Sequence, residues 1–279
     1  MVHNESEIES RHGRLLRVYL QEVESTNTFA TQLIRSESES IDKKSGFLVV
    51  TSNQISGRGQ REKNWDSSEN KDLAMTWVVM NPPKVDATVF NMAAALATSK
   101  GIRNTVLKKY EIEIPKASLS VKWPNDVMFW SNTEWRKVAG ILVENQWRGE
   151  SWTSSLVGIG VNVLSRRVSK SYNAVSISDV LGIELKPEDL ELPIIEILLD
   201  YIKLLNEEGG ADKIVEQFNS ELYSVGETRE FIVEGVSHSG VLLKIDSNGM
   251  GEFDWKSENP PKSNLHSSEV QWVFGLHSA

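Results

Sequence analysis

The sequence predicts an α+β protein, in which a mixed sheet carries helices on one side and a small, mostly β domain follows. Short continuous apolar runs such as Phe47–Thr51 are typical of buried strands. Segments with apolar residues at helical spacing, such as Ile194–Asn206, indicate helices packed on a core. After residue 226 the apolar runs become short and strand-like, so we place a mixed α+β domain at 1–226 and a small, mostly β domain at 227–279.

The elements of the first half follow from these patterns in order. We expect residues 1–14 to be a frayed arm and Arg14–Glu22 to be the first strand. A helix is predicted over Thr26–Ile34, with Ser25 or Thr26 as its N-cap. The remaining elements of this half are the strands Phe47–Thr51 and Leu73–Met80 and the long helix Ala87–Tyr110.

The second half begins with three strand-like segments, Leu119–Trp123, Lys137–Gln146 and Ser154–Val163. Arg148 and Gly149 supply a turn between the last two, which predicts a hairpin. Helices then follow at Ile194–Asn206 and Ala211–Tyr223, and the terminal domain is expected to contain the strands Arg229–Val233, Gly240–Asp246, Gly251–Trp255 and Val270–Phe274.

Composition excludes several classes of protein. The 279 residues carry a formal net charge of −9, which argues against a general nucleic-acid binder, because phosphate contacts require a basic face. The absence of cysteine excludes disulfides, thiol nucleophiles and cysteine–zinc sites. No apolar run is long enough to span a bilayer, and the polar, acidic start is unlike a signal peptide, so a cytoplasmic protein without membrane contact is expected.

The stretch ISGRGQREKNW over 55–65 places Arg58, Arg61 and Lys63 in a segment too rich in glycine for a helix. Gly57 and Gly59 allow the backbone to wrap closely around an anion, and arginine can grip a carboxylate or phosphate with two hydrogen bonds. A plain surface turn is the alternative for such a glycine pattern. The cations on both sides favour an anion-binding loop, closed by Trp65, which would cover a planar ring.

Four further motifs each have a plain structural alternative. Lys122-Trp123-Pro124-Asn125-Asp126 is either a turn or a strand end that presents a cation and a carboxylate for magnesium or ribose. Lys137 is either an exposed lysine at the edge of the sheet or a cation in a binding site. It begins a strand in which Gly140 would allow another group to approach the backbone closely. Gly158-Ile159-Gly160-Val161-Asn162 is either a bulge or a place for a ligand, and Ser25-Thr26-Asn27 is by itself a helix cap.

No obvious protein nucleophile accompanies these motifs. None of the five histidines lies in them or is spaced as a metal ligand, and the chain has no Gly-x-Ser-x-Gly, Walker or HExxH pattern. The motifs therefore favour a reaction in which the protein positions two substrates and neutralises charge while a substrate oxygen attacks.

In this order, the motifs Ser-Thr-Asn, Gln…Gly-Arg-Gly, Lys-Trp-Pro-Asn-Asp, Lys-x-Ala-Gly-Ile-Leu-x-Glu and Gly-Ile-Gly-x-Asn resemble those of the biotin protein ligase family. The resemblance is close from residue 18 to about 185. It implies that biotin and ATP, with Mg²⁺, form biotinyl-5′-adenylate, and that a lysine of a biotin carboxyl carrier domain then takes the biotinyl group. It also implies a catalytic domain related to class II aminoacyl-tRNA synthetases, followed by an SH3-like barrel.

The resemblance also assigns roles residue by residue. It implies that Lys137 and Arg58 are catalytic. Biotin-binding positions would be Ser25, Thr26, Asn27, Gln54, Arg58, Gly59, Gln60, Lys137 and Gly140. Nucleotide-binding positions would be Gly57, Arg61, Trp65, Lys122, Asn125, Asp126 and Asn162. No protein ligand for Mg²⁺ is assigned, because the ATP phosphates would hold most of it.

Two positions depart from the family pattern. Gln60 stands where many relatives have arginine, and Glu62 replaces a glycine, which adds negative charge to an anion loop and could weaken its hold on the adenylate.

Fewer than twenty residues precede the first expected strand, so no DNA-binding domain and no DNA contact are expected. A homodimer is compatible with the resemblance, and so is a monomer. A lipoate ligase and a non-catalytic biotin-binding module are the rival functions.

Overall fold

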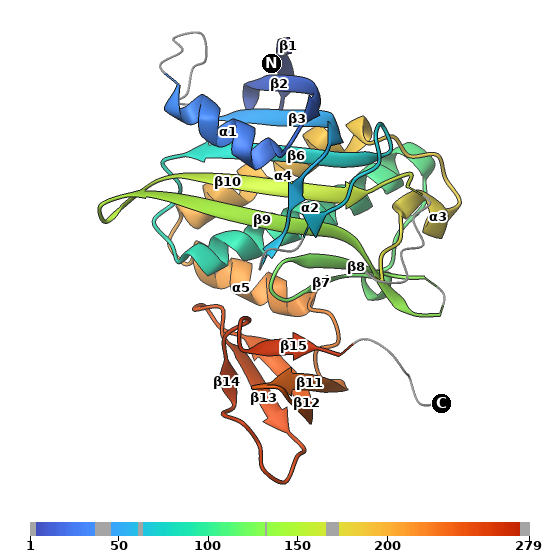
Figure 1. Cartoon of the computed structure of the whole chain (residues 1–279), viewed down its shortest axis with the longest axis vertical. Helices are drawn as coiled ribbons and strands as arrows, with labels where there is room; N and C mark the ends of the chain where they lie inside the picture. The colour runs from blue at the N-terminus through green and yellow to red at the C-terminus, as the bar shows by residue number, and fades with distance from the viewer. Residues whose placement is uncertain (1–3, 37–45, 61–63, 132, 166–172, 274–279) are drawn as a thin grey trace.

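The computed structural model describes residues 4–36, 46–60, 64–131, 133–165 and 173–273 (Figure 1). Its centre is an eight-stranded sheet in the order β1-β2-β3-β6-β10-β9-β8-β7. The strands are β1 Asn4–Ser10, β2 Gly13–Val23, β3 Phe47–Gln54, β6 Asp72–Met80, β7 Leu119–Lys122, β8 Asp126–Trp130, β9 Trp135–Arg148 and β10 Ser151–Asn162. Only the pair β2–β3 is parallel in this sheet, and the other neighbours are antiparallel. The predicted mixed sheet is therefore confirmed.

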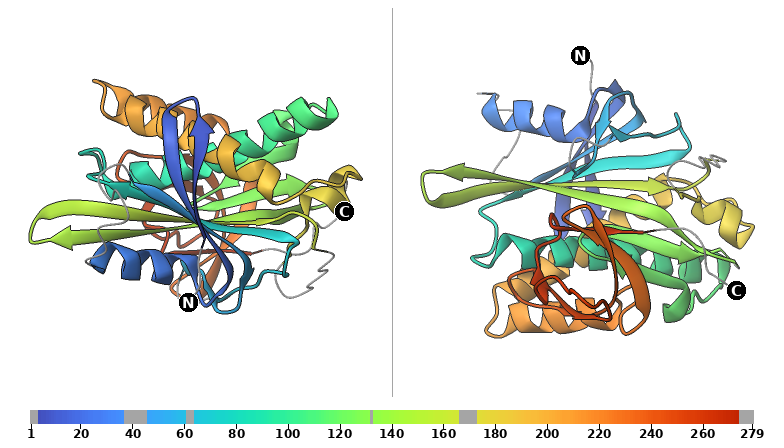
Figure 2. Two further views of the ribbon diagram at one scale, coloured as in Figure 1. Left: turned by 90° about the horizontal axis from the view of Figure 1, so that it is seen from above. Right: turned by 60° about the horizontal axis from the view of Figure 1, so that its bottom comes forward.

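Helices cover both faces of this sheet, so the prediction of helices on one side is wrong. Helix α1 (Thr26–Arg35) lies on one face, while α2 (Ala87–Tyr110) and α4 (Glu188–Leu205) lie on the other (Figure 2). Two separate buried clusters correspond to the two faces. The reason is visible in β6, in which all residues but the last are buried. A strand that is apolar on both sides needs a cover on both sides.

Most predicted elements are present, and their boundaries extend by a few residues. Ser25 is the N-cap of α1, and its side chain accepts a hydrogen bond from the backbone of Thr28. The hairpin of β9 and β10 turns at Gly149, whose φ of 61° suits a residue without a Cβ. Helix α5 (Gly210–Ser220) matches the second predicted helix of the region after residue 190.

The expectation of a frayed arm at residues 1–14 is wrong for the part that is described. Residues 4–10 form β1, which pairs with β2 at the edge of the sheet. Its sequence is polar because it is an exposed edge strand, a position at which charged side chains oppose unwanted pairing. Pattern reasoning also missed β8, the short helix α3 (Ile177–Leu181) and the first six residues of α4.

The chain ends in a separate five-stranded antiparallel sheet in the order β14-β13-β12-β11-β15. Its strands are β11 Thr228–Val233, β12 Val236–Ile245, β13 Gly251–Trp255, β14 Asn264–Leu265 and β15 Val270–Trp272. This sheet lies beside β7 and α5 (Figure 1), and the all-β character predicted for the region is confirmed. The domain boundary at 226/227 stays a prediction.

The small sheet is tied directly to the large one. The indole Nε1 of Trp123, which follows β7, donates to the carbonyl oxygen of Gly249 at 3.2 Å. The segment before β11 forms a parallel bridge with β7, in which the backbone N–H of Tyr223 donates to Val121 O at 2.8 Å. In the described part of the chain, no helix is long and apolar enough to cross a membrane.

Candidate active site

A cavity of about 680 Å³ opens where the N-terminus of α1, the strands β9 and β10, and β15 of the small sheet meet. Fourteen of the predicted site residues line it: Ser25, Thr26, Asn27, Gln54, Arg58, Gly59, Gln60, Trp65, Lys122, Asn125, Asp126, Lys137, Gly140 and Asn162. Gly57 is not on its wall but lies in the small ladder that β4 (Gly57–Arg58) forms with β5 (Asn64–Trp65). Arg61, Glu62 and Lys63 lie outside the described residues.

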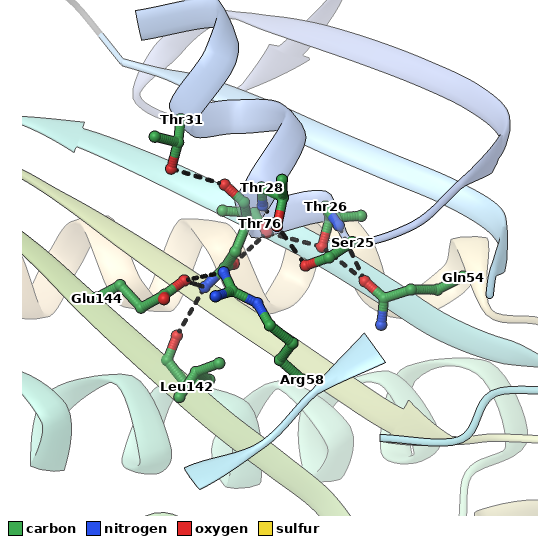
Figure 3. Close-up of polar contacts among 10 residues, drawn as sticks. Ser25, Thr26, Thr28, Thr31, Gln54, Arg58, Thr76, Leu142 and Glu144 are labelled. Atoms are coloured by element: carbon green, nitrogen blue, oxygen red, sulfur yellow. Dashed lines mark hydrogen bonds and ion pairs between the residues drawn. The ribbon is translucent and has the colours of Figure 1, made fainter. Parts of the chain in front are cut away.

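One end of the cavity is a buried polar network at the start of α1 (Figure 3). Gln54 Oε1 accepts from the backbone N–H of Thr26 at 2.9 Å, which fixes the orientation of the Gln54 amide and leaves its Nε2 to donate elsewhere. The hydroxyl of Thr76, a fully buried residue of β6, lies 2.6 Å from Asn27 Oδ1 and 2.8 Å from Thr26 Oγ1. The N-cap segment is therefore both a helix cap and a cavity wall.

Asn27 presents an acceptor rather than a donor to the cavity. Its Nδ2 donates to Glu144 Oε2 at 2.6 Å and to Leu142 O at 3.4 Å, so both amide hydrogens are used. Its Oδ1 accepts from Thr76 and keeps a second lone pair. A Cβ at Gly158 would lie 2.5 Å from this oxygen, so the glycine gives Asn27 its room. A ligand at this end must therefore offer an N–H or O–H group.

Arg58 is held by a carboxylate. Its Nη2 lies 3.0 Å from Glu144 Oε2, the same oxygen that accepts from Asn27, and the Arg58 side chain is 49% exposed. The predicted anion-binding arginine therefore already has a partner on β9. An exposed ion pair of this kind contributes little free energy. An incoming anion can therefore replace Glu144 as the partner of Arg58 with little loss of stability.

Trp65 lies against the glycines of β9 and β10. A Cβ at Gly160 would come within 2.3 Å of its ring, and one at Gly140 within 3.0 Å. Lys137 Nζ lies 5.4 Å from the centroid of the same ring, within the range of a cation–π contact. What approaches the backbone at these glycines is thus an aromatic ring, and the alternative of a bulge is wrong here, because the irregularity of β10 lies at Trp152/Ser154.

The central charge cluster consists of Asp126 between two lysines. Lys137 Nζ lies 2.6 Å from Asp126 Oδ1, and Lys122 Nζ lies 3.2 Å from Oδ2. Burial by itself would raise the pKa of Asp126, but Lys137 and then Lys122 outweigh that effect and lower the pKa to about 2. Asp126 is therefore ionised, and the trio carries a net charge of +1. The edge-lysine alternative for Lys137 is wrong, because β9 is an interior strand.

The two asparagines at the nucleotide-side positions hold the backbone of β9. Asn125 Nδ2 donates to Ile141 O, and Ile141 N–H donates back to Asn125 O at 2.9 Å. Asn162 Nδ2 donates to Lys137 O at 3.4 Å. Both residues line the cavity, and their contact with a nucleotide stays a prediction.

Sequence reasoning missed several residues of this site. Glu144 was seen only as the last letter of a motif, and Thr76 only as part of an apolar strand. A buried threonine inside an otherwise apolar run was the one available signal for Thr76. The small domain also supplies part of the cavity wall, and no sequence pattern indicated this. The residues concerned are Ile232, Ser267, Val270, Gln271, Trp272 and Val273.

Comparison with known proteins agrees with this geometry. Residues 19–162 match the family model described as the biotin/lipoate A/B protein ligase family. The bifunctional ligase/repressor BirA of Escherichia coli (strain K12) is 28% identical over 241 residues, which are 82% of this chain and 68% of that protein. BirA of Bacillus subtilis (strain 168) is 29% identical over 136 residues, 48% of this chain but only 38% of its own length. The biotin--[acetyl-CoA-carboxylase] ligase of Paracoccus denitrificans is 32% identical over 52% of this chain and 53% of its own.

Solved structures share the fold. The biotin protein ligase from Aquifex aeolicus in complex with biotin and ATP superposes with a TM-score of 0.69 at 22% identity, and covers 93% of this chain and 99% of its own. The biotin protein ligase from Leishmania major in complex with biotinyl-5-AMP gives a TM-score of 0.59 at 20% identity, and covers 89% of this chain and 98% of its own.

Proposed function

The chain belongs to the biotin/lipoate A/B protein ligase family, and from that premise we propose that it is an ATP-dependent biotin–[biotin carboxyl-carrier protein] ligase. It forms biotinyl-5′-adenylate and passes the biotinyl group to a lysine of the carrier domain of a biotin-dependent carboxylase. The observation that carries the proposal is one cavity with a neutral polar network at Asn27 and a cationic cluster at Lys122 and Lys137.

The polar end suits the ureido ring of biotin. That ring has two N–H donors and one carbonyl acceptor, and Asn27 Oδ1 is fixed as an acceptor by Thr76, Glu144 and Leu142. Gln54 Nε2 is a donor on the same wall. The dithiolane ring of lipoate has no N–H group, so lipoate would leave these buried groups unsatisfied. Sites of this kind reject such analogues by about 10⁴-fold.

The cationic end suits the joining of two anions. In the first step a carboxylate oxygen of biotin attacks the α-phosphorus of ATP, an O–P bond forms, and the bond to pyrophosphate breaks. Lys122 and Lys137 flank the single carboxylate of Asp126 on the cavity wall, so this cluster carries a net charge of +1. This charge offsets the repulsion between the carboxylate and the triphosphate.

In the second step the ε-amine of the carrier lysine attacks the acyl carbon, and AMP leaves with the bonding electrons while the amine loses a proton. Neither step requires a nucleophile from this chain. Arg58 and Lys137 act by holding the reacting oxygens, and Trp65 covers the nucleotide.

We propose that Mg²⁺ enters with ATP and is held chiefly by phosphate oxygens. Within the described ranges no three histidine, aspartate or glutamate side chains gather as a metal site. The carboxylate of Asp126, whose side chain is 17% exposed, is already paired with two lysines, which makes it a poor ligand for a cation. Mg²⁺ would neutralise charge on the leaving pyrophosphate.

A cytoplasmic location, a lack of DNA binding and a choice between monomer and homodimer remain predictions. The net charge of −9 supports only the lack of DNA binding, because it disfavours a phosphate backbone as a partner.

The proposed function is tested by measuring the transfer of biotin to a carrier domain. Purified protein, ATP, Mg²⁺ and labelled biotin are incubated with a biotin carboxyl carrier domain, and in parallel with labelled lipoate. We expect label on the acceptor lysine from biotin only, with pyrophosphate released. Transfer of lipoate but not biotin would establish the rival ligase, and binding of biotin without pyrophosphate release would establish a non-catalytic binding module.

A further inference from the structure

Lys122 lies at the junction of the two sheets. It ends β7, and its side chain is 11% exposed. Its Nζ lies 3.2 Å from Asp126 on one side and 5.8 Å from the centroid of the Trp272 ring on the other. Trp272 belongs to β15 of the small sheet, so a cation of the large sheet is held against an aromatic face of the small one.

Trp272 offers a face that is fixed by its neighbours. Its ring packs against Phe231, with centroids 4.9 Å apart, and against Tyr223, with centroids 5.5 Å apart. Its side chain is buried, and the indole Nε1 has no hydrogen-bond partner within the part of the chain that is described. The contact with Lys122 therefore depends on the π face of the indole rather than on its N–H donor.

Hydrogen bonds join the two sheets on both sides of Lys122. Val121 N–H donates to Glu221 O and Tyr223 N–H donates to Val121 O, each at 2.8 Å, so β7 and the entry to the small sheet form one ladder. Trp123 donates to Gly249 O on the far side of Lys122. The small sheet is thus attached on both flanks of Lys122, by backbone hydrogen bonds at Val121 and by the indole of Trp123.

We propose that Trp272 is a positioning residue for the nucleotide: it holds the Lys122 ammonium group at the cavity, where that group meets the polyphosphate of ATP. Without the ring, the ammonium group of Lys122 loses its contact with this aromatic face of the small sheet. This inference rests on the proposed function, because it assigns Lys122 to the ATP end of that site. It makes the small β sheet a functional part of the adenylation site.

The test uses the full chain and steady-state kinetics of pyrophosphate release with ATP and biotin varied separately. We expect Trp272→Leu to raise the KM for ATP by about tenfold, the scale of a partly desolvated cation–π contact, and to leave the KM for biotin unchanged. Trp272→Phe keeps a π face and should restore most of the ATP affinity. Trp255→Leu removes another aromatic ring of the same sheet and should leave both constants near wild type.

A double-mutant cycle shows whether the ring acts through Lys122. In a Lys122→Met background, Trp272→Leu should have no further effect on the KM for ATP. Additive effects would overturn the proposal, as would equal rises in the two KM values, which would mean a general loss of structure.

A second measurement avoids the risk that Trp272→Leu fails to fold. Tryptophans with one, two and three ring fluorines are placed at position 272 by site-specific incorporation, which weakens the π face while keeping its shape. We expect the logarithm of the KM for ATP to rise with each fluorine; a flat series would overturn the inference. Wild-type protein that releases no pyrophosphate at all would refute the proposed function instead, so the two failures are distinguishable.

Discussion

The replacement Asp126→Asn tests the electrostatics of the site most directly. Asp126 is held between Lys137 and Lys122 at 2.6 and 3.2 Å. Burial would raise its pKa, but the two lysines lower it from 3.8 to about 2. Because the pKa is lowered on folding, this carboxylate stabilises the folded chain fully above pH 4, and the stabilisation is lost as the pH falls toward 2.

The size of the effect follows from the same pKa. The interval between 3.8 and about 2 corresponds to about 2 kcal/mol, at 1.36 kcal/mol per pKa unit. Asparagine imitates the protonated carboxyl group in shape and charge. We therefore expect Asp126→Asn to lower the free energy of unfolding by about 2 kcal/mol at pH 7 and by about half as much at pH 3.

Urea unfolding of wild type and variant at pH 7, 4 and 3 measures this difference. Asp254→Asn is the matched control, because Asp254 forms an exposed pair with Lys256 in which both side chains are 51% exposed. Its effect should stay below about 0.5 kcal/mol at each pH. If the Asp126→Asn difference does not shrink between pH 7 and pH 3, or does not exceed the control, the account of this cluster is wrong.

Three further predictions concern the rest of the site. Lys137→Ala should leave the fold intact and slow adenylation by about 100-fold or more, as measured by pyrophosphate release; an unchanged rate would contradict the role assigned to it. Thr76→Val keeps its shape but removes the hydroxyl that orients Asn27, so calorimetry should show about tenfold weaker biotin binding with ATP binding unaffected. Gly160→Ala places a Cβ within 2.3 Å of the Trp65 ring, so the indole must move and the KM for ATP should rise; an unaltered KM would mean that this ring does not serve the nucleotide.

Much of the architecture could be predicted from local patterns. Helix α2 matches its predicted range, and the ends of β3, β6, β9 and β10 differ from prediction by three residues or fewer. These elements have strong periodicity or long apolar runs, and the period of a pattern depends only on neighbouring residues. The same patterns did not predict edge strand β1, because an exposed edge strand has almost no apolar face.

The sequence by itself determined which chemistry the chain can offer: no thiol, no paired histidines, and a set of glycines, amides and cations in a recognisable order. Only the tertiary structure decided how these groups are oriented. It turned Asn27 into an acceptor, gave Arg58 a carboxylate partner and placed Trp272, 150 residues after Lys122, beside that lysine. Such contacts join residues from distant strands, and their geometry depends on sheet order and on the docking of the second sheet. Local patterns contain no information about either of these.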